Sequence, residues 1–189
     1  MQELRDRILA EGEAIGRDVL KVDSFLNHQI DPAFIQRMGK EIAGLFAGEG
    51  VTKVLTVEAS GIAVAAAAGL FLGVPVVFAK KKQAVTQQGD VYTAEVFSFT
   101  RREKVHIAVN AKYLGPQDVV LIVDDFLAHG EALNGLVKIV RQAGAKLAGA
   151  GIVIEKRFQR GGEALRAAGV RIESLAVIEK MEAGVIEFG

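Results

Sequence analysis

Two adjacent acidic residues and the small-residue run after them are the part of this sequence best suited to chemistry. Asp124 and Asp125 follow a strongly apolar run, and segment 128–132 leads into a predicted helix. Neighbouring carboxylates can accept hydrogen bonds from vicinal hydroxyls or bind a hydrated metal ion. Small residues at a helix N-terminus let backbone N–H groups approach an anion, which the helix dipole also favours. The pattern indicates a sugar phosphate site, although a solvated turn with an Asp N-cap has the same signature.

A second segment of this kind lies earlier in the chain. Residues 58–61 follow a short apolar run and open a predicted helix, so they form a second candidate anion site. Ordinary N-capping by Ser60 would explain the same residues. Lys80, Lys81 and Lys82 follow the next apolar run and would either neutralise phosphate charge or form a solvated basic loop. Two anion sites after neighbouring strands suit a ligand with two phosphate ends.

Alternating strands and helices would place both segments at one edge of a sheet. Apolar β-rich runs alternate with helical runs, which is typical of an α/β fold with a parallel sheet covered on both faces. Ligands bind such sheets at the carboxyl ends of the strands. We expect strands at 53–57, 74–79, 119–123, 152–154 and 170–178. We expect helices at 1–16, from Asp31 to about Gly48, and at 61–72, 130–143 and 163–168.

Residues 80–110 interrupt this alternation. Two strand-like runs flank Arg101-Arg102 and predict an antiparallel hairpin inserted in the parallel pattern. Long polar insertions in compact domains are usually functional or mobile, so we expect a flexible hairpin that covers the site. We interpret 1–189 as one domain, in which residues 1–50 form an N-terminal helical region.

Composition narrows the classes of function. The chain has 189 residues, 23 basic and 23 acidic side chains, and no cysteine. The missing cysteines exclude thiol catalysis, disulfide scaffolds and cysteine-ligated metals. A neutral balance argues against a nonspecific nucleic-acid binder. The three histidines lack metal-ligand spacing, and the sequence contains no phosphate-binding GxxxxGK[ST] motif. We therefore expect no metal held by the protein and no nucleic-acid partner.

One uncharged stretch, Ala59–Ala79, is about as long as a membrane span. Its middle is mostly alanine, and Gly69, Gly73 and Pro75 interrupt it, so we expect a buried helix and strand instead. The charged N-terminus has no apolar signal-peptide core, which predicts a cytoplasmic location and no membrane partner.

At four places the sequence resembles a known family. VVLIVDDFLAHGEA at 119–132 resembles the 5-phosphoribosyl-1-pyrophosphate (PRPP) signature of type I phosphoribosyltransferases. LKVDSFLNHQIDP at 20–32, GVPVVFAKK at 73–81 and GIVIEKRFQ at 151–159 resemble the bacterial xanthine phosphoribosyltransferases of that family. The resemblance covers essentially the whole chain. It implies purine salvage by transfer of the 5-phosphoribosyl group of PRPP to N9 of xanthine, giving xanthosine 5′-monophosphate and pyrophosphate. It also implies Mg²⁺ carried by PRPP and a homodimer.

The resemblance implies roles for individual residues as well. Asp124 and Asp125 would be the catalytic pair that holds the ribose hydroxyls. The other implied contacts are Ala128, His129, Gly130, Glu131 and Ala132 with the 5′-phosphate, Glu58, Ala59, Ser60 and Gly61 with the pyrophosphate, Lys80 and Lys81 in a flexible loop, and Leu20, Asn27 and Lys156 with xanthine. His129 and Glu131 depart from the Asn and Gln of similar sequences. We therefore expect backbone N–H groups to bind the phosphate and Glu131 to turn outward.

Two alternatives stay open at this point. The purine could be hypoxanthine or guanine, although a donor such as the Asn27 amide would favour the C2 oxygen of xanthine over the C2 amino group of guanine. Lys156 could instead be a surface lysine, and Asn27 a residue that caps a loop.

The second alternative is a regulator, because phosphoribosyltransferase-like folds also serve as PRPP-sensing transcription regulators. The first 20 residues are too short and too mixed in charge for a DNA-binding winged helix.

Overall fold

The computed structural model describes residues 1–81, 90–98, 103–182 and 184–189. Lys82, Arg101 and Arg102, which the sequence places in basic loops, lie outside the described residues. The α-helices are α1 (Gln2–Glu11), α2 (Pro32–Leu45), α3 (Gly61–Leu72), α4 (Glu131–Gln142) and α5 (Gly161–Ala167), and a π-helix spans Asp23–Asn27. The strands are β1 (Glu13–Ile15), β2 (Val19–Lys21), β3 (Lys53–Val57), β4 (Val76–Ala79), β5 (Val91–Ser98), β6 (Glu103–Asn110), β7 (Val119–Leu127), β8 (Lys146–Lys156), β9 (Ile172–Glu182) and β10 (Val185–Phe188).

A six-stranded sheet with the strand order β10-β9-β8-β7-β3-β4 forms the centre of the molecule. The pairs β9-β8, β8-β7, β7-β3 and β3-β4 are all parallel, and β10 alone runs antiparallel. The predicted α/β class with a parallel sheet is therefore confirmed. Since β3 and β7 are neighbours, the segments that follow them meet at the same edge of the sheet.

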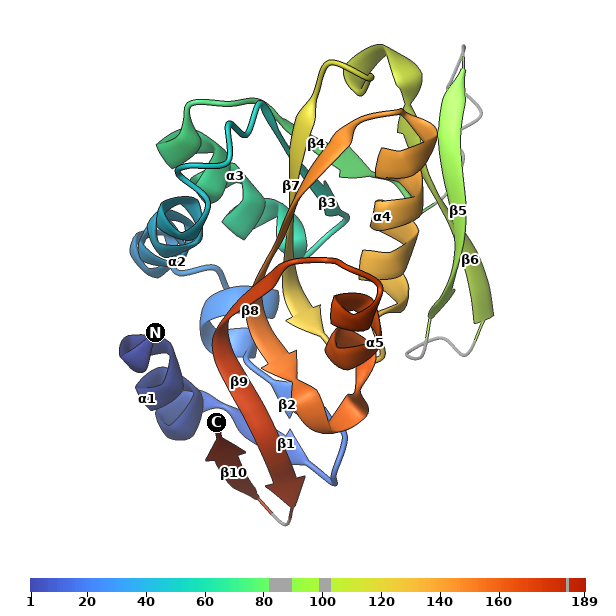
Figure 1. Ribbon diagram of the computed structural model, residues 1–189. Coiled ribbons are helices and arrows are strands. Elements are labelled where there is room, and N and C mark those ends of the chain that lie inside the picture. Colours follow the sequence, from blue (N-terminus) through green and yellow to red (C-terminus); the bar gives the residue numbers. More distant parts are fainter. Residues whose placement is uncertain (82–89, 99–102, 183) are drawn as a thin grey trace.

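Helices cover both faces of this sheet, with α2 and α3 on one side and α4 on the other (Figure 1). The alternation of side chains in β7 explains why its sequence is continuously apolar. Leu121 and Val123 belong to the core under α2 and α3, whereas Val120 and Ile122 belong to the core under α4. Because both faces of this part of β7 are buried, an unpaired polar side chain at any of these four positions would lower the stability of the fold.

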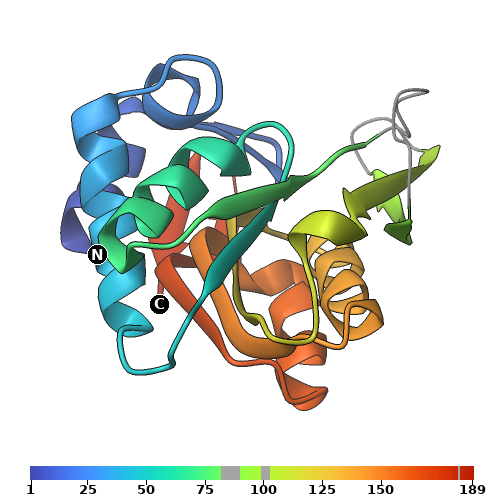
Figure 2. The ribbon, with the colours of Figure 1, turned by 90° about the horizontal axis from the view of Figure 1, so that it is seen from above.

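The predicted inserted hairpin is confirmed as the antiparallel pair β5-β6. It packs along α4, on the side of the molecule away from α1 and α2 (Figure 2). Gly135 of α4 permits the close approach, because a Cβ there would lie 2.4 Å from Cγ1 of Val96. The Gln142 side chain also accepts a hydrogen bond from the Thr93 N–H at 3.1 Å and donates one to the Thr93 carbonyl at 2.8 Å.

The uncharged stretch Ala59–Ala79 forms α3 and β4, as predicted. Its alanines let α2 and α3 pack closely, since a Cβ on Gly39 would lie 2.4 Å from the Cβ of Ala67. In the described part of the chain, no helix has both the length and the apolar character needed to cross a membrane.

Several predicted boundaries are wrong in ways that matter for the site. The first helix ends at Glu11, because Gly12 is extended and the chain then forms the small β1-β2 ladder through Gly16 at φ +61°. Ile15 is consequently exposed rather than on a buried helical face. β7 and β8 continue beyond the predicted strand ends to Leu127 and Lys156, and β10 was not predicted.

Candidate active site

The acidic pair lies inside the carboxyl end of β7 rather than in the loop after it. Asp124 is 4% exposed and Asp125 7% exposed. The Asp125 N–H donates to Oδ1 of Asp124 at 3.0 Å. Burial raises the pKa of Asp124 well above its ordinary value, and the charge of Asp125 adds to this shift. The pair is therefore poised for a ligand that supplies positive charge or hydroxyl donors.

The segment 58–61 lies directly against this pair. A Cβ on Gly61 would lie 2.4 Å from Oγ1 of Thr56 and 2.8 Å from Oδ1 of Asp124. Only a glycine lets the start of α3 come this close to the carboxylate. Oγ1 of Thr56 is buried with no hydrogen-bond partner among the described residues, so it is available to a ligand or a water at this point.

The rest of segment 58–61 joins the ends of β3 and β4. The Glu58 N–H donates to the Ala79 carbonyl at 3.1 Å, and Oε1 of Glu58 accepts from the Lys81 N–H at 2.6 Å. The Glu58–Ala59 peptide bond is cis. The Ser60 side chain makes no capping hydrogen bond to α3, so ordinary capping does not account for this serine.

Lys80 and Lys81, two of the three lysines considered as partners for phosphate, lie in different surroundings. The Lys81 N–H donates to Oε1 of Glu58 at 2.6 Å, and the charge of Lys81 lowers the pKa of Asp124 in opposition to burial. Lys80 exchanges two backbone hydrogen bonds with Ala108 of β6, both of 3.0 Å. It lines a separate cavity of about 610 Å³ with Phe78 and Tyr113, beside the outer edge of β4. Lys81 is therefore joined to segment 58–61 through Glu58, whereas Lys80 belongs to the edge of the sheet and to this separate cavity.

The segment 128–132 connects β7 to α4. Gly130 is the N-cap of α4 and has a φ of +82°, a conformation that favours glycine. The Ala128 carbonyl accepts from the Gly161 N–H at 3.1 Å, so α5 lies against this segment. Oε2 of Glu131 accepts from the Phe97 N–H of β5 at 3.4 Å, which agrees with the expectation that Glu131 turns outward. His129 is exposed.

Lys156 is the last residue of β8 and is only 9% exposed. Its ammonium donates to the Asp18 carbonyl at 2.6 Å and lies 5.2 Å from the ring centroid of Phe126. Burial lowers the pKa of Lys156, and the charge of Asp18 partly opposes this shift. Lys156 is therefore not a surface lysine, and the bond to Asp18 brings β2, with buried Leu20, to the end of β8.

Comparison with known proteins shows which family has this arrangement of residues. The model of the phosphoribosyl transferase domain matches residues 21–163, which include the acidic pair and both small-residue segments. The chain belongs to the phosphoribosyltransferase family. The xanthine phosphoribosyltransferase of Heliobacterium modesticaldum is 74% identical over 188 residues, which cover 100% of both chains. That of Moorella thermoacetica is 60% identical over 185 residues, which cover 98% of this chain and 94% of the relative.

Solved phosphoribosyltransferases share the fold. The adenine phosphoribosyltransferase of Giardia lamblia, complexed with 9-deazaadenine, superposes with a TM-score of 0.77 at 26% identity, covering 92% of this chain and 96% of that one. The enzyme of Rhodothermus marinus has a TM-score of 0.76 at 18% identity, covering 94% and 100%. The likeness at such low identity concerns the arrangement of strands and helices.

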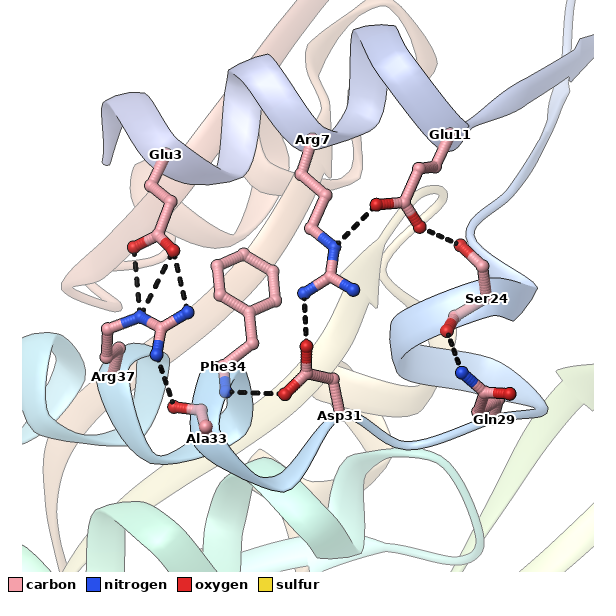
Figure 3. A network of polar contacts seen from close by, with 9 residues as sticks. All are labelled: Glu3, Arg7, Glu11, Ser24, Gln29, Asp31, Ala33, Phe34 and Arg37. Carbon is pink, nitrogen blue, oxygen red and sulfur yellow. Dashed lines mark hydrogen bonds and ion pairs between the residues drawn. The ribbon is translucent and has the colours of Figure 1, made fainter.

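A network at the N-terminus of this phosphoribosyltransferase fixes the segment that contains Asn27 (Figure 3). The guanidinium carbon of Arg7 lies 4.8 Å from the ring centroids of both Phe25 and Phe34. Nη1 of Arg7 donates to Oδ2 of Asp31 at 2.6 Å, and this bond lowers the pKa of Asp31. α1 is thereby joined to the start of α2 and to the π-helix.

A second arm of the network reaches the π-helix itself. Oε1 of Glu11 accepts from Nε of Arg7 at 3.0 Å, and Oε2 accepts from Oγ of Ser24 at 2.6 Å. Asn27 is the exposed last residue of this π-helix. The structure thus positions the Asn27 segment through α1, although it does not bring the Asn27 side chain into a hydrogen bond with Lys156.

Replacing Asp31 separates its two roles in this network. Asp31 caps α2 through the Phe34 N–H at 3.0 Å and pairs with Arg7. We expect Asp31→Ala to lower the urea midpoint of unfolding more than Asp31→Asn, because Asn is also a good N-cap but carries no charge. The pKa of Asp31 is lowered by folding, so its ionic contribution is present at neutral pH and lost as pH falls through that pKa. The difference between wild type and Asp31→Asn should therefore vanish in acid; a constant difference would contradict the ionic role.

Sequence reasoning missed Thr56, Asp18 and Phe126 at this site. Thr56 is a polar residue in a run that is otherwise apolar apart from Lys53, and this was an available signal. Asp18 contributes its backbone carbonyl, and Phe126 its ring face, so their residue types gave no indication of either contact.

Proposed function

We propose that the chain transfers the 5-phosphoribosyl group of PRPP to N9 of xanthine and releases pyrophosphate and xanthosine 5′-monophosphate. The proposal is supported above all by three parts of the chain that meet at the carboxyl ends of β3 and β7: the acidic pair, segment 58–61 and segment 128–132. Segment 58–61 touches Asp124 through Gly61, and segment 128–132 continues directly from the same strand. Relatives that match over the full chain are named xanthine phosphoribosyltransferases, which supports xanthine as the purine.

In this reaction the acidic pair binds the sugar. Asp124 and Asp125 accept hydrogen bonds from the ribose hydroxyls and stabilise positive charge as the bond from C1 to pyrophosphate breaks. The transition state resembles an oxocarbenium ion, so positioning and charge stabilisation matter more than a strong nucleophile. The buried position of both carboxylates supports this role, because charge interactions are stronger where water is excluded.

The two loops bind the two phosphate ends of the donor. Backbone N–H groups of residues 128–132, at the N-terminus of α4, hold the 5′-phosphate. Segment 58–61 and Lys81 hold the pyrophosphate, and the unpartnered hydroxyl of Thr56 lies where it can contribute a further hydrogen bond. The outward bond of Glu131 to Phe97 keeps its carboxylate from opposing the 5′-phosphate.

The residues at the site fit Mg²⁺ that arrives with PRPP. Two buried carboxylates offer the hard oxygen atoms that this ion prefers, and the raised pKa of Asp124 indicates that a nearby cation would stabilise its charged form. No cluster of three or more His, Cys, Asp or Glu side chains suited to a metal occurs among the described residues. When bound, Mg²⁺ would neutralise charge on the departing pyrophosphate. Asp124 and Asp125 would bind its hydration shell.

Lys156 is the residue we assign to recognition of the purine. Its ammonium can donate to a purine carbonyl in place of the Asp18 carbonyl, and the Phe126 ring beside it offers an apolar surface for a planar base. Leu20 and Asn27, both within the N-terminal 50 residues, complete the proposed purine contacts.

We also propose that the β5-β6 hairpin covers the site. A homodimer, which the resemblance implies, and a cytoplasmic location stay predictions.

The direct test is a side-by-side assay of pyrophosphate release with PRPP, Mg²⁺ and each of xanthine, guanine and hypoxanthine. We expect the highest kcat/KM with xanthine. Preference for guanine or hypoxanthine would make the chain a hypoxanthine/guanine phosphoribosyltransferase. A lack of turnover with all three purines, together with binding of PRPP and of DNA fragments, would favour a PRPP-sensing regulator.

The role of Lys156 predicts a specific pH dependence. Because burial lowers its pKa, the ammonium loses its proton at a lower pH than an exposed lysine, and the KM for xanthine should rise as pH increases through that pKa. Lys156→Arg, which stays charged, should lack this rise, and Lys156→Met should raise the KM roughly tenfold at neutral pH. Ionisation of xanthine itself affects all three proteins equally. The same pH profile in wild type and Lys156→Arg would refute the assignment.

A further inference from the structure

Glu155 is a buried acidic residue that the proposed reaction does not use. It is 1% exposed, and both of its oxygens are paired. Oε1 accepts from Nη1 of Arg166 at 2.6 Å, and Oε2 accepts from Nη2 of Arg166 at 2.8 Å and from Oγ of Ser174 at 2.6 Å. Burial by itself would raise the pKa of Glu155, but the bonds from Arg166 and Ser174 hold it below the ordinary value. The group is therefore a charged carboxylate in a two-pronged ion pair.

This ion pair joins the end of β8 to α5. A Cβ on Gly162 would lie 2.3 Å from Oε1 of Glu155, so the first turn of α5 is pressed against the carboxylate. Arg166, in the last turn of the same helix, supplies both of the charged hydrogen bonds. Glu155 thus contacts α5 at both of its ends.

The first residue of α5 also contacts segment 128–132. A Cβ on Gly161 would lie 2.3 Å from the His129 carbonyl carbon and 2.4 Å from the Ala128 oxygen. The Gly161 N–H donates to that same oxygen at 3.1 Å. The start of α5 therefore contacts both Glu155 and segment 128–132.

We propose that Glu155 and Arg166 are positioning residues for the 5′-phosphate subsite. Their ion pair fixes α5, and α5 fixes segment 128–132 in the conformation whose N–H groups bind the phosphate. Binding by backbone groups depends on such preorganisation, because a mobile segment must lose conformational entropy when the ligand binds. This inference rests on the proposed function, in which segment 128–132 binds the 5′-phosphate of PRPP.

The position of Glu155 makes the proposed effect selective. Glu155 and Lys156 are consecutive at the end of β8, yet they contact different regions of the molecule. Glu155 pairs with α5, whereas Lys156 bonds to Asp18 beside the proposed purine contacts. Loss of the ion pair should therefore weaken binding of the phosphorylated donor and leave binding of the purine nearly unchanged.

The test compares Glu155→Gln with wild type in the full-length chain. Arg166 is 35% exposed at its side chain, so this variant leaves its charge in reach of water rather than buried and unpaired. We expect the KM for PRPP and the dissociation constant of ribose 5-phosphate each to rise about tenfold. The KM for xanthine should change less than about twofold. Arg166→Lys should recover some of the affinity that Arg166→Met loses.

Matched variants separate positioning from a general loss of stability. Glu49→Gln breaks a pair with Arg171 of the same 2.6 Å length, at a distance from segment 128–132, and should leave both KM values unchanged. Gly161→Ala keeps the ion pair but pushes on segment 128–132 directly, so it should reproduce the selective rise even if Glu155→Gln folds poorly. The double variant Glu155→Gln with Arg166→Met should be no worse than Arg166→Met alone.

Defined outcomes would overturn the proposal. A lower melting temperature with unchanged ribose 5-phosphate affinity would make the ion pair merely structural. Equal rises in the KM for PRPP and for xanthine would have the same consequence. Failure of the wild-type chain to bind ribose 5-phosphate would instead overturn the phosphate assignment of segment 128–132, and with it the proposed function on which this inference rests.

Discussion

Replacing Asp124 and Asp125 together by Asn is expected to lower kcat/KM about 10²-fold or more, by analogy with other lost transition-state contacts. The amides fill the same space, but they neither accept hydroxyl donors as strongly nor stabilise the positive charge that develops on the ribose. Steady-state rates of pyrophosphate release measure the effect. Because the positive charge on the ribose develops only in the transition state, loss of its stabilisation should lower kcat, whereas loss of the hydroxyl bonds should raise the KM for PRPP.

The stability of this double variant distinguishes lost chemistry from lost folding. Burial raises the pKa of Asp124, so the folded state holds its proton more tightly than the unfolded state does. In wild type, the free energy of unfolding should therefore fall as pH rises from the unfolded to the folded pKa of this group. The variant should lack that fall and be at least as stable at neutral pH.

Asp118 provides the matched control on the same segment of chain. It lies just before β7, at the opposite end from the acidic pair, and is 5% exposed. Its carboxylate pairs with Lys53 at 3.2 Å and accepts from the Gly115 N–H at 2.9 Å. Asp118→Asn should reduce stability with little change in kcat. Unchanged kinetics in the double variant, or an equal loss in Asp118→Asn, would reject the assigned role of the acidic pair.

Gly61→Ala is expected to reduce kcat/KM about 10²-fold as well, because displacements near 1 Å at reacting groups can have that effect. The new Cβ would lie 2.4 Å from Oγ1 of Thr56 and 2.8 Å from Oδ1 of Asp124. Neither neighbour is the far end of a long, flexible side chain, so the start of α3 or the carboxylate has to shift. Both movements separate the proposed pyrophosphate segment from the acidic pair.

Gly44→Ala is the corresponding control. Gly44 is in α2, and a Cβ there would meet no atom within 4 Å. The variant should keep full activity and raise the free energy of unfolding by about 0.5–1 kcal/mol, since alanine is the better helix former. Urea unfolding and the pyrophosphate assay measure the two properties. Normal kinetics in Gly61→Ala would show that the contact with Asp124 has no role in the reaction.

Local patterns were sufficient for the class of fold and for the candidate segments. The alternation of apolar strands with helices predicted the parallel sheet, and the runs around Asp124 and Gly61 predicted which strand ends to inspect. The predicted strand ends were less accurate. The strand at 119–123 was expected to end at the first charged residue, but β7 continues through Asp124 and Asp125. Hydrogen bonds to β8 extend β7 through those residues to Leu127.

The sequence by itself determined the α/β class, the acidic pair and the two small-residue segments, because those features depend on residue type and short-range spacing. Its resemblance to type I phosphoribosyltransferases, carried by the motifs around these residues, implied the family. Only the tertiary structure decided that Gly61 meets Asp124, that Lys81 bonds to Glu58 of segment 58–61, and that Glu155 pairs with Arg166 of the helix that contacts segment 128–132. Lys156 meets the Asp18 carbonyl across 138 positions of chain. Contacts of that range depend on strand order, register and helix packing, which no local pattern contains.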